Sequence, residues 1–254
     1  MRIISVVTPV HPPHVRYLPE AYASLRAQAL PDGWEWEWLV QHDGDDGGAV
    51  SRLLPADPRV KIAAFSPASG EACTRNLAFA RSTGEFVRNL DGDDRLTEGA
   101  LERDVQVLLT HENVGWVTSA ALDLLPDGEV VSWEFGDPAE GVLEPGWLLD
   151  TFVRDDWRLP VVPGTMCVRR ELLLALGAWM GLPRSADTGL LMALQTVSAG
   201  YFIGTPGMLY RKHPAQVTAT GIHNDPVDKE LRYGMIVDRA RALRTLLGQP
   251  TTTR

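Results

Sequence analysis

Short apolar segments alternate with helical segments over residues 3–90, and this alternation constrains the fold more than any other feature. The apolar segments, which we interpret as strands, are 3–10, 36–41, 60–65 and 85–90. The helical segments between them are 17–29, 49–54 and 72–80. Strands that alternate with helices form parallel sheets through right-handed crossovers. The sequence therefore predicts an α/β fold with a mostly parallel central sheet flanked by helices.

Polar turns follow three of the predicted strands directly, at 8–11, 42–46 and 91–94. The carboxyl ends of parallel strands meet at one edge of a sheet, and ligands bind there in open α/β folds. We therefore expect these three turns to line a single crevice.

The most acidic of these turns contains Asp91, Asp93 and Asp94, three carboxylates within four residues. Like charges at this spacing repel one another, so fold stability alone seldom explains such a cluster. Hard oxygen ligands suit Mg²⁺ or Mn²⁺, and phosphate groups often complete the shell of such an ion. The cluster predicts a divalent cation and a phosphorylated substrate. The alternative interpretation is an acidic turn that caps a helix beginning near Thr97.

Charge and composition exclude several functional classes. The formal net charge of -9 argues against a nucleic-acid partner, which would need a basic face. No segment approaches the ~20 apolar residues of a membrane span, although peripheral contact with a membrane stays open. Cys73 and Cys167 lie far apart and show neither a disulfide framework nor a zinc spacing. We therefore expect a cytoplasmic protein.

The pattern becomes less regular after residue 96. We expect helices at 98–109, 171–176 and 188–199, and strands at 115–121, 130–135, 166–169, 201–203 and 208–211. Segment 136–163 is rich in proline and glycine and is interpreted as loops with one short helix. An amphipathic helix is predicted over 226–247, and its apolar stripe permits packing on the domain or a homodimer.

Several segments, in the same order along the chain, resemble family-2 glycosyltransferases of the GT-A fold. They are SVVTPV at 5–10, HDGDD at 42–46, TRNLAFARSTGEFVRNLDGDD at 74–94, the region of Asp187, and YRKHPAQVT at 210–218. The resemblance implies one GT-A domain over 1–222, with a nucleotide-sugar half of about 1–96 and an acceptor half of about 97–222. The C-terminal helix and tail then occupy 223–254.

The resemblance also implies how a nucleotide-diphosphate sugar, preferably a UDP-sugar, would be bound. Residues expected to border the nucleotide are Thr8, Pro9, Val10, Asp43, Arg75, Asp91 and Gly92. Within this set, Asp43 would accept a hydrogen bond from the base, and Arg75 would lie at a helix N-terminus beside the nucleotide. Asp93 would bind the Mn²⁺ or Mg²⁺ ion, with Asp91, Asp94 and His213 as further ligands. His213 is alternatively a strand-end histidine with a backbone partner.

Asp187 matches the position of the family's catalytic base. It would take the proton of an acceptor hydroxyl as that oxygen attacks the anomeric carbon. One in-line displacement would invert the anomeric configuration. Asp187 is alternatively a cap of the predicted helix 188–199. The acceptor stays open between a glycan, a lipid-linked sugar and a small natural product.

The chain departs from the family pattern at three places. His11-Pro12-Pro13-His14 replaces the usual Tyr-Asn after the first strand, His42 replaces the first of two aspartates, and Ala186 replaces a glutamate. The donor base therefore stays open between uracil, guanine and thymine. His11, His14 and His42 lie at the predicted crevice, where a lone histidine is more often structural.

Two other functions remain as alternatives. A sugar-nucleotide nucleotidyltransferase usually begins with a glycine-rich, basic loop for a triphosphate, and residues 1–13 contain no such loop. A non-catalytic binding protein with the same fold is the second alternative. The joint presence of Asp91, Asp93, Asp187 and His213 argues against it.

Overall fold

The computed structural model describes residues 1–132, 136–214, 216, 221, 223 and 225–248. Its strands are β1 (Arg2–Val10), β2 (Trp34–Asp43), β3 (Val60–Phe65), β4 (Phe86–Asn89), β5 (Arg95–Leu96), β6 (Val114–Leu124), β7 (Val130–Val131), β8 (Gly141–Leu143), β9 (Cys167–Arg169) and β10 (Ala199–Arg211). Its α-helices are α1 (Leu18–Arg26), α2 (Ala49–Leu53), α3 (Glu71–Ala80), α4 (Ala100–Thr110), α5 (Trp147–Arg154), α6 (Arg170–Ala175), α7 (Ala186–Val197) and α8 (Pro226–Leu246). Short 3₁₀ helices are η1 (Pro12–Tyr17) and η2 (Pro163–Thr165).

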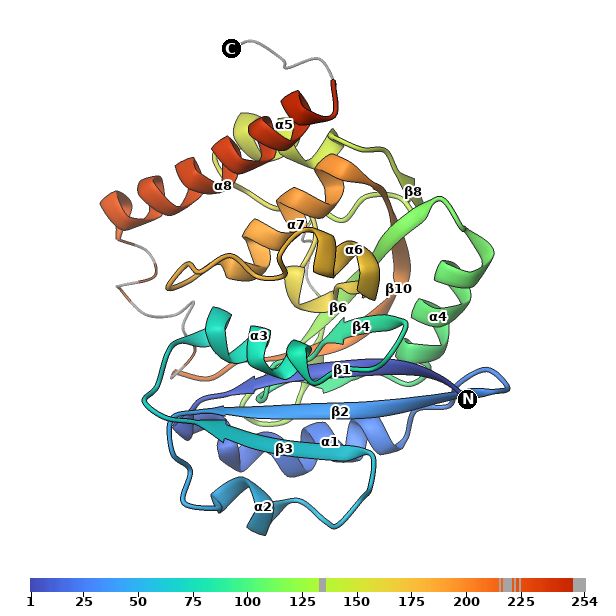
Figure 1. Ribbon diagram of the computed structural model, residues 1–254, viewed down its shortest axis with the longest axis vertical. Helices are drawn as coiled ribbons and strands as arrows, with labels where there is room; N and C mark the ends of the chain where they lie inside the picture. The colour runs from blue at the N-terminus through green and yellow to red at the C-terminus, as the bar shows by residue number, and fades with distance from the viewer. Residues whose placement is uncertain (133–135, 215, 217–220, 222, 224, 249–254) are drawn as a thin grey trace.

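All of these strands belong to one sheet (Figure 1). The order is β3-β2-β1-β4-β9-β6-β10-β5, with β7 beside β6 and β8 beside β10. The four strands predicted before residue 91 pair in parallel, as expected. Beyond β4 the sheet is mixed, because β9 runs antiparallel to both β4 and β6 while β10 runs parallel to β6.

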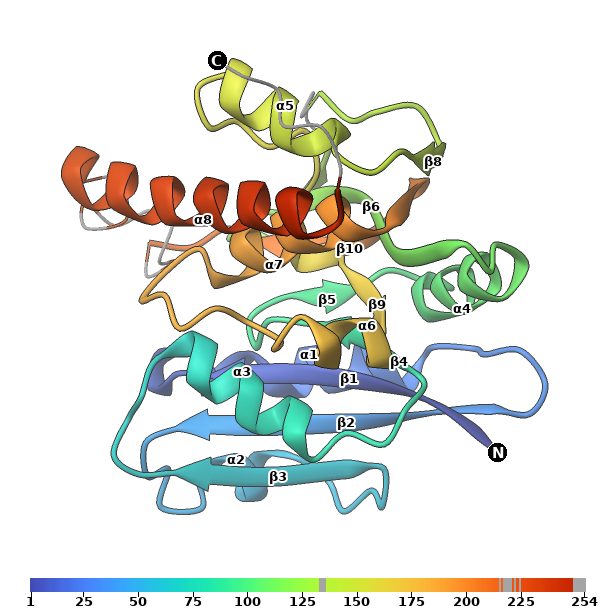
Figure 2. The ribbon, with the colours of Figure 1, turned by 45° about the horizontal axis from the view of Figure 1, so that its top comes forward.

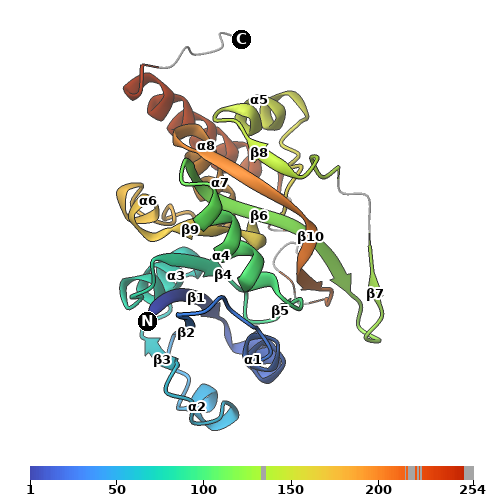
Figure 3. The same ribbon diagram turned by 90° about the vertical axis from the view of Figure 1, so that its right-hand side faces the viewer.

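The sheet separates two apolar clusters, and the alternation of side chains along β1 shows how. Ile4 and Val6 belong to a cluster that includes residues of α1 and α4, whereas Val7 belongs to a cluster with residues of α3 and α7. Successive side chains of a strand point to opposite faces, so one buried strand supplies both clusters. Figure 3 shows α1 and α3 on opposite sides of the first strands.

Several segments differ from their predicted form. The strands expected at 201–203 and 208–211 form the single strand β10, which has a register irregularity between Ile203 and Met208. The predicted loop segment contains β8, a strand of three residues that pairs with β10. The helix expected near Thr97 begins at Ala100, after β5. The predicted strand over 130–135 falls partly on 133–135, outside the described residues.

The C-terminal helix α8 packs on the domain, along α7 (Figure 2). Ile236, Val237 and Ala240 of α8 are buried in the same cluster as α7, at helical spacing. Leu231 and Met235 lie on the exposed side, so a homodimer through this helix stays a prediction. No helix in the described part of the chain has the length and apolar composition needed to cross a bilayer.

Candidate active site

A cavity of about 420 Å³ lies at the carboxyl ends of β1 and β4. It brings together predicted site residues that are far apart in the chain, among them Pro9, Asp93 and Asp187. Two of the three predicted polar turns reach it, whereas residues 42–46 do not line it. The lining residues are Pro9, His11, His14, Glu71, Asp91, Gly92, Asp93, Asp94, Leu159, Val162, Pro163, Gly164, Ser185, Asp187, Thr188, Met208, Tyr210, Lys212, Gln216, His223 and Tyr233.

Asp93 and His213 meet beside this cavity although 120 residues separate them. His213 Nε2 lies 2.8 Å from Asp93 Oδ2, so its side-chain partner is a carboxylate rather than the backbone. The backbone N–H of Arg211 donates to Asp94 Oδ1 at 2.9 Å, and Arg211 Nε donates to the carbonyl of Asp93 at 2.7 Å. The end of β10 thus holds the acidic turn in place.

Asp94 is buried, and its Oδ2 lacks a hydrogen-bond partner among the residues that the structure describes. Burial and the nearby charges of Asp93 and Asp91 raise the pKa of Asp94 well above its usual value. The alternative that this turn caps a helix is wrong for Asp94, because its carboxylate bonds to the Arg211 amide and α4 begins only after Gly99. A buried carboxylate oxygen without a partner, beside a second carboxylate, fits a divalent cation.

Arg75 occupies a different place from the one expected. It lies in the second turn of α3 and is 1% exposed, and it does not line the cavity. Its guanidinium contacts Asp91 Oδ1 and Glu71 Oε1, both at 2.7 Å. A buried charge must be paired, and these carboxylates supply the pairing. Arg75 therefore positions two carboxylates of the cavity wall.

Asp187 lies in the first turn of α7, faces the cavity, and is half-buried. The N–H of Thr188 donates to Asp187 Oδ1 at 2.8 Å, so a helix-terminal contact and a cavity position coexist. Burial and the charges of Glu71 and Asp91 raise the pKa of Asp187 to about 6, against the opposing effect of Arg75. A carboxylate with such a pKa can accept a proton near neutral pH.

Glu71 is a cavity residue that the sequence analysis missed. An acid in the first turn of a helix is common for stability alone, so the pattern gave no reason to single it out.

Of the other residues predicted to contact the nucleotide, some line the cavity and others do not. Pro9 lines the cavity, whereas Thr8 and Val10 are fully buried, and the Thr8 hydroxyl accepts a hydrogen bond from Trp38 Nε1. The carboxylate of Asp43 accepts from the N–H groups of Ser69 and Gly70. Gly70 has φ +87°, a conformation that favours glycine. Asp43 thus anchors the loop before α3, and its contact with a base stays a prediction.

Comparison with protein families adds to this geometry. The model described as "Glycosyl transferase family 2" matches residues 5–176 of the chain. The chain belongs to this family. The matched range contains the acidic turn, Arg75 and most of the sheet, whereas Asp187 and His213 lie beyond it.

Two curated proteins show what this family 2 glycosyltransferase resembles. It is 29% identical to the O-antigen biosynthesis protein RfbC of Myxococcus xanthus over 179 residues, 69% of this chain and 13% of that protein. It is 27% identical to the putative teichuronic acid biosynthesis glycosyltransferase TuaG of Bacillus subtilis (strain 168), over 42% of each chain. This chain therefore spans less than half the length of either relative.

Solved structures confirm the predicted fold of this family 2 glycosyltransferase. The structure of S. aureus TarS 1-349 in complex with UDP matches with a TM-score of 0.64 and 19% identity, over 84% of this chain and 61% of that chain. The complex of the same protein with UDP-GlcNAc gives a TM-score of 0.67 and 17% identity, over 87% and 61%. The fold is thus a GT-A fold: one α/β domain with a curled central sheet.

Proposed function

We propose that this glycosyltransferase moves a sugar from a nucleotide-diphosphate sugar, preferably a UDP-sugar, to an acceptor hydroxyl with inversion. One observation carries the proposal. Asp187 and the acidic turn that includes Asp91 and Asp93 line the same cavity, although they lie on separate elements of the fold. A single displacement requires a proton acceptor and a binding site for the donor diphosphate within one cavity.

The acidic turn would hold the donor. Asp93, Asp94 and His213 offer oxygen and nitrogen atoms to Mn²⁺ or Mg²⁺, and Asp91 is held beside them by Arg75. Such a cation, when bound, neutralises the charge that develops on the leaving diphosphate. The UDP and UDP-GlcNAc complexes of TarS support a uridine donor for this fold.

Asp187 would supply the base. In its ionised form it would accept the proton of the acceptor hydroxyl while that oxygen attacks the anomeric carbon. The Thr188 N–H and the N-terminus of α7 stabilise the charged carboxylate and fix its orientation. Since the attacking oxygen displaces the diphosphate in one step, the product has the inverted configuration.

Binding of nucleoside diphosphates tests this proposal. Calorimetric titrations of UDP, GDP and dTDP, each with and without Mn²⁺, should show binding of one diphosphate that depends on the metal. The Asp93→Asn variant should lose the Mn²⁺-dependent part, and Asp127→Asn, which removes the same charge from an exposed turn, should keep it. A folded wild-type protein that binds none of the three would contradict the proposal and favour the non-catalytic binding protein.

Family membership favours sugar transfer over nucleotidyl transfer. The acceptor remains a glycan, a lipid-linked sugar or a small natural product, because the names of the relatives refer to two different products, O-antigen and teichuronic acid.

A further inference from the structure

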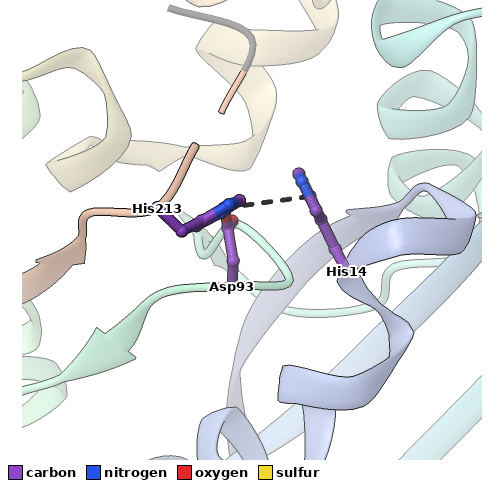
Figure 4. A group of neighbouring side chains, drawn as sticks. All are labelled: His14, Asp93 and His213. Atoms are coloured by element: carbon purple, nitrogen blue, oxygen red, sulfur yellow. Dashed lines mark hydrogen bonds and ion pairs between the residues drawn. The ribbon is translucent and has the colours of Figure 1, made fainter. Parts of the chain in front are cut away.

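We propose that His14 is a third protein ligand of the cation, so that His14, Asp93 and His213 bind Mn²⁺ before any nucleotide arrives. The three side chains come from η1, the acidic turn and the segment after β10 (Figure 4). This inference rests on the proposed function in one respect: both place the cation in the cavity that Asp187 lines. It adds a ligand from the segment where this chain departs from its family.

The prolines after β1 explain how His14 reaches this position. Pro12 and Pro13 begin the 3₁₀ helix η1, in which the N–H of His14 donates to the carbonyl of His11 at 2.9 Å. Proline fits the first turn of a helix because its missing N–H would have no partner there. The short turn begins directly after β1 and places the His14 ring at the cavity rather than in solvent.

The distances suit one shared ion. His213 Nε2 lies 2.8 Å from Asp93 Oδ2, and His14 Nδ1 lies 3.8 Å from the same oxygen. One ligand atom from each residue lies within 4.8 Å of the other two. Atoms bound to one ion at about 2.1 Å stand at most about 4.2 Å apart, so small side-chain rotations complete the set. The His14 and His213 rings approach edge to face, with centroids 5.3 Å apart.

Two further observations point to a cation. Asp94 is 1% exposed, lines the cavity, and has an Oδ2 atom without a partner among the described residues. The Asp93 carboxylate pairs with imidazoles and with no lysine or arginine in the part of the chain that the structure describes. Arg211, whose side chain reaches the acidic turn, donates instead to the Asp93 carbonyl and to Glu20. A metal ion bound here would supply the positive charge that no described lysine or arginine brings to this carboxylate.

Two imidazoles and one carboxylate also set a preference among metals. Mg²⁺ favours oxygen ligands and retains its water, whereas Mn²⁺, a transition metal, tolerates imidazole nitrogen beside carboxylate oxygen. With His14 in the shell, the site should select Mn²⁺ over Mg²⁺ more strongly than a site of carboxylates and one histidine.

Nucleotide-free metal binding tests the inference. Electron paramagnetic resonance measures free Mn²⁺ during titration of the full chain, the His14→Ala variant and the His11→Ala variant. His11 is the matched control, because it lies three residues away and its Nδ1 faces Asp43 at 3.4 Å. We expect wild type and His11→Ala to bind Mn²⁺ with equal affinity. His14→Ala should bind Mn²⁺ at least about tenfold more weakly than wild type. Excess Mg²⁺ should also displace Mn²⁺ more readily from His14→Ala than from wild type.

Equal Mn²⁺ affinity of His14→Ala and wild type would overturn the inference, as would failure of wild type to bind Mn²⁺ without nucleotide. Spin-echo spectra of bound Mn²⁺ provide a readout independent of the variant's folding. In wild type, these spectra should show coupling of Mn²⁺ to nitrogens of two imidazoles. Coupling to only one imidazole would reject His14 as a ligand.

UDP titrations in saturating Mn²⁺ on the same samples separate this inference from the proposed function. If Mn²⁺ binding without nucleotide depends on His14 but no diphosphate binds, the His14 ligand is supported and the proposed function is rejected. If UDP binds but the Mn²⁺ affinity does not depend on His14, the proposed function is supported and the His14 ligand is rejected.

Discussion

At the scale of single residues, the carboxylates around the cavity differ in whether an arginine pairs with them. Arg75 is buried between Glu71 and Asp91 and compensates part of their charge. Among the residues that the structure describes, no lysine or arginine forms an ion pair with Asp187, and its raised pKa follows from burial and the negative charge of Glu71. A carboxylate destabilised in this way is a better proton acceptor than one neutralised by a salt bridge.

Replacing Asp187 by Asn should remove the base while keeping the shape of the site. We expect kcat for sugar transfer to fall about 10²- to 10⁴-fold, the usual contribution of general base catalysis. The affinity for UDP in Mn²⁺ should change little, since Asp187 is not one of the proposed metal ligands. Steady-state rates with a UDP-sugar and calorimetry of UDP measure the two effects, with Asp127→Asn as control. Unchanged turnover would place the base elsewhere.

The pH profile should report the same residue. Asp187 is active only when ionised, and its pKa of about 6 lies above the usual 3.8, so kcat/KM should rise with pH and level off above about 6. Below that pKa the rate should fall about tenfold per pH unit. Initial rates from pH 4.5 to 8, with Mn²⁺ saturation checked at each pH, measure the profile. A rate that is flat between pH 5 and 7 would exclude Asp187 as the titrating base.

At the scale of elements, the buried side chain of Glu37 on β2 links β2 to its two neighbouring strands and to the turn before β4. Glu37 accepts hydrogen bonds from Ser5 of β1, Thr83 of the turn before β4 and Lys61 of β3. Burial would raise the pKa of Glu37, but these hydrogen bonds together lower it. The ionised carboxylate therefore stabilises the folded state at neutral pH.

Glu37→Gln should destabilise the fold by about 3 kcal/mol at pH 7, because Lys61 and the Thr83 amide lose a charged partner. Since the folded pKa lies below the reference value of 4.5, the difference from wild type should narrow as pH falls below about 4.5. Urea unfolding at pH 7 and pH 4 measures both effects. Glu35→Gln, two residues earlier on the same strand and partly exposed, should change stability by less than about 0.5 kcal/mol. Equal effects of the two variants would contradict this role.

The elements that the sequence predicted well are those whose pattern is local. Alternation and turn residues identified the first four strands, and the acidic turn after residue 90 followed from its charge. The strand β8 was missed because three residues carry no pattern, and only its pairing with β10 defines it. The continuity of β10 was missed because Gly204, Pro206 and Gly207 interrupt the apolar pattern of that strand.

At the scale of the whole molecule, the cavity is built from segments of both halves of the chain. The sequence placed Asp93, Asp187 and His213 in one site through motif order, and the structure brings them to one region. The sequence places His14 at the crevice but does not predict a metal ligand there, because its approach to Asp93 depends on how η1 folds. Arg75 was expected beside the nucleotide, but it pairs with Glu71, four residues earlier on α3, and with Asp91, which reaches it only when the turn after β4 folds against that helix.

Ligand binding should stabilise the whole fold. A ligand at 100 times its Kd adds about 2.7 kcal/mol, which for a chain of this size raises Tm by about 5–10 °C. We expect UDP with Mn²⁺ to give this shift, and UDP with a chelator to give a much smaller one. Scanning calorimetry measures both. Shifts of equal size with and without metal would contradict a cation that bridges protein and diphosphate.

A crystal structure of this chain with Mn²⁺ and UDP, using the anomalous signal of manganese, would show directly whether the cation and the donor share the cavity. We expect a manganese peak within bonding distance of Asp93 and His213. We also expect the terminal phosphate of UDP to contact that ion, inside the cavity that Asp187 lines. A manganese ion bound elsewhere, or UDP bound outside this cavity, would contradict the proposal that the acidic turn and Asp187 act on one donor.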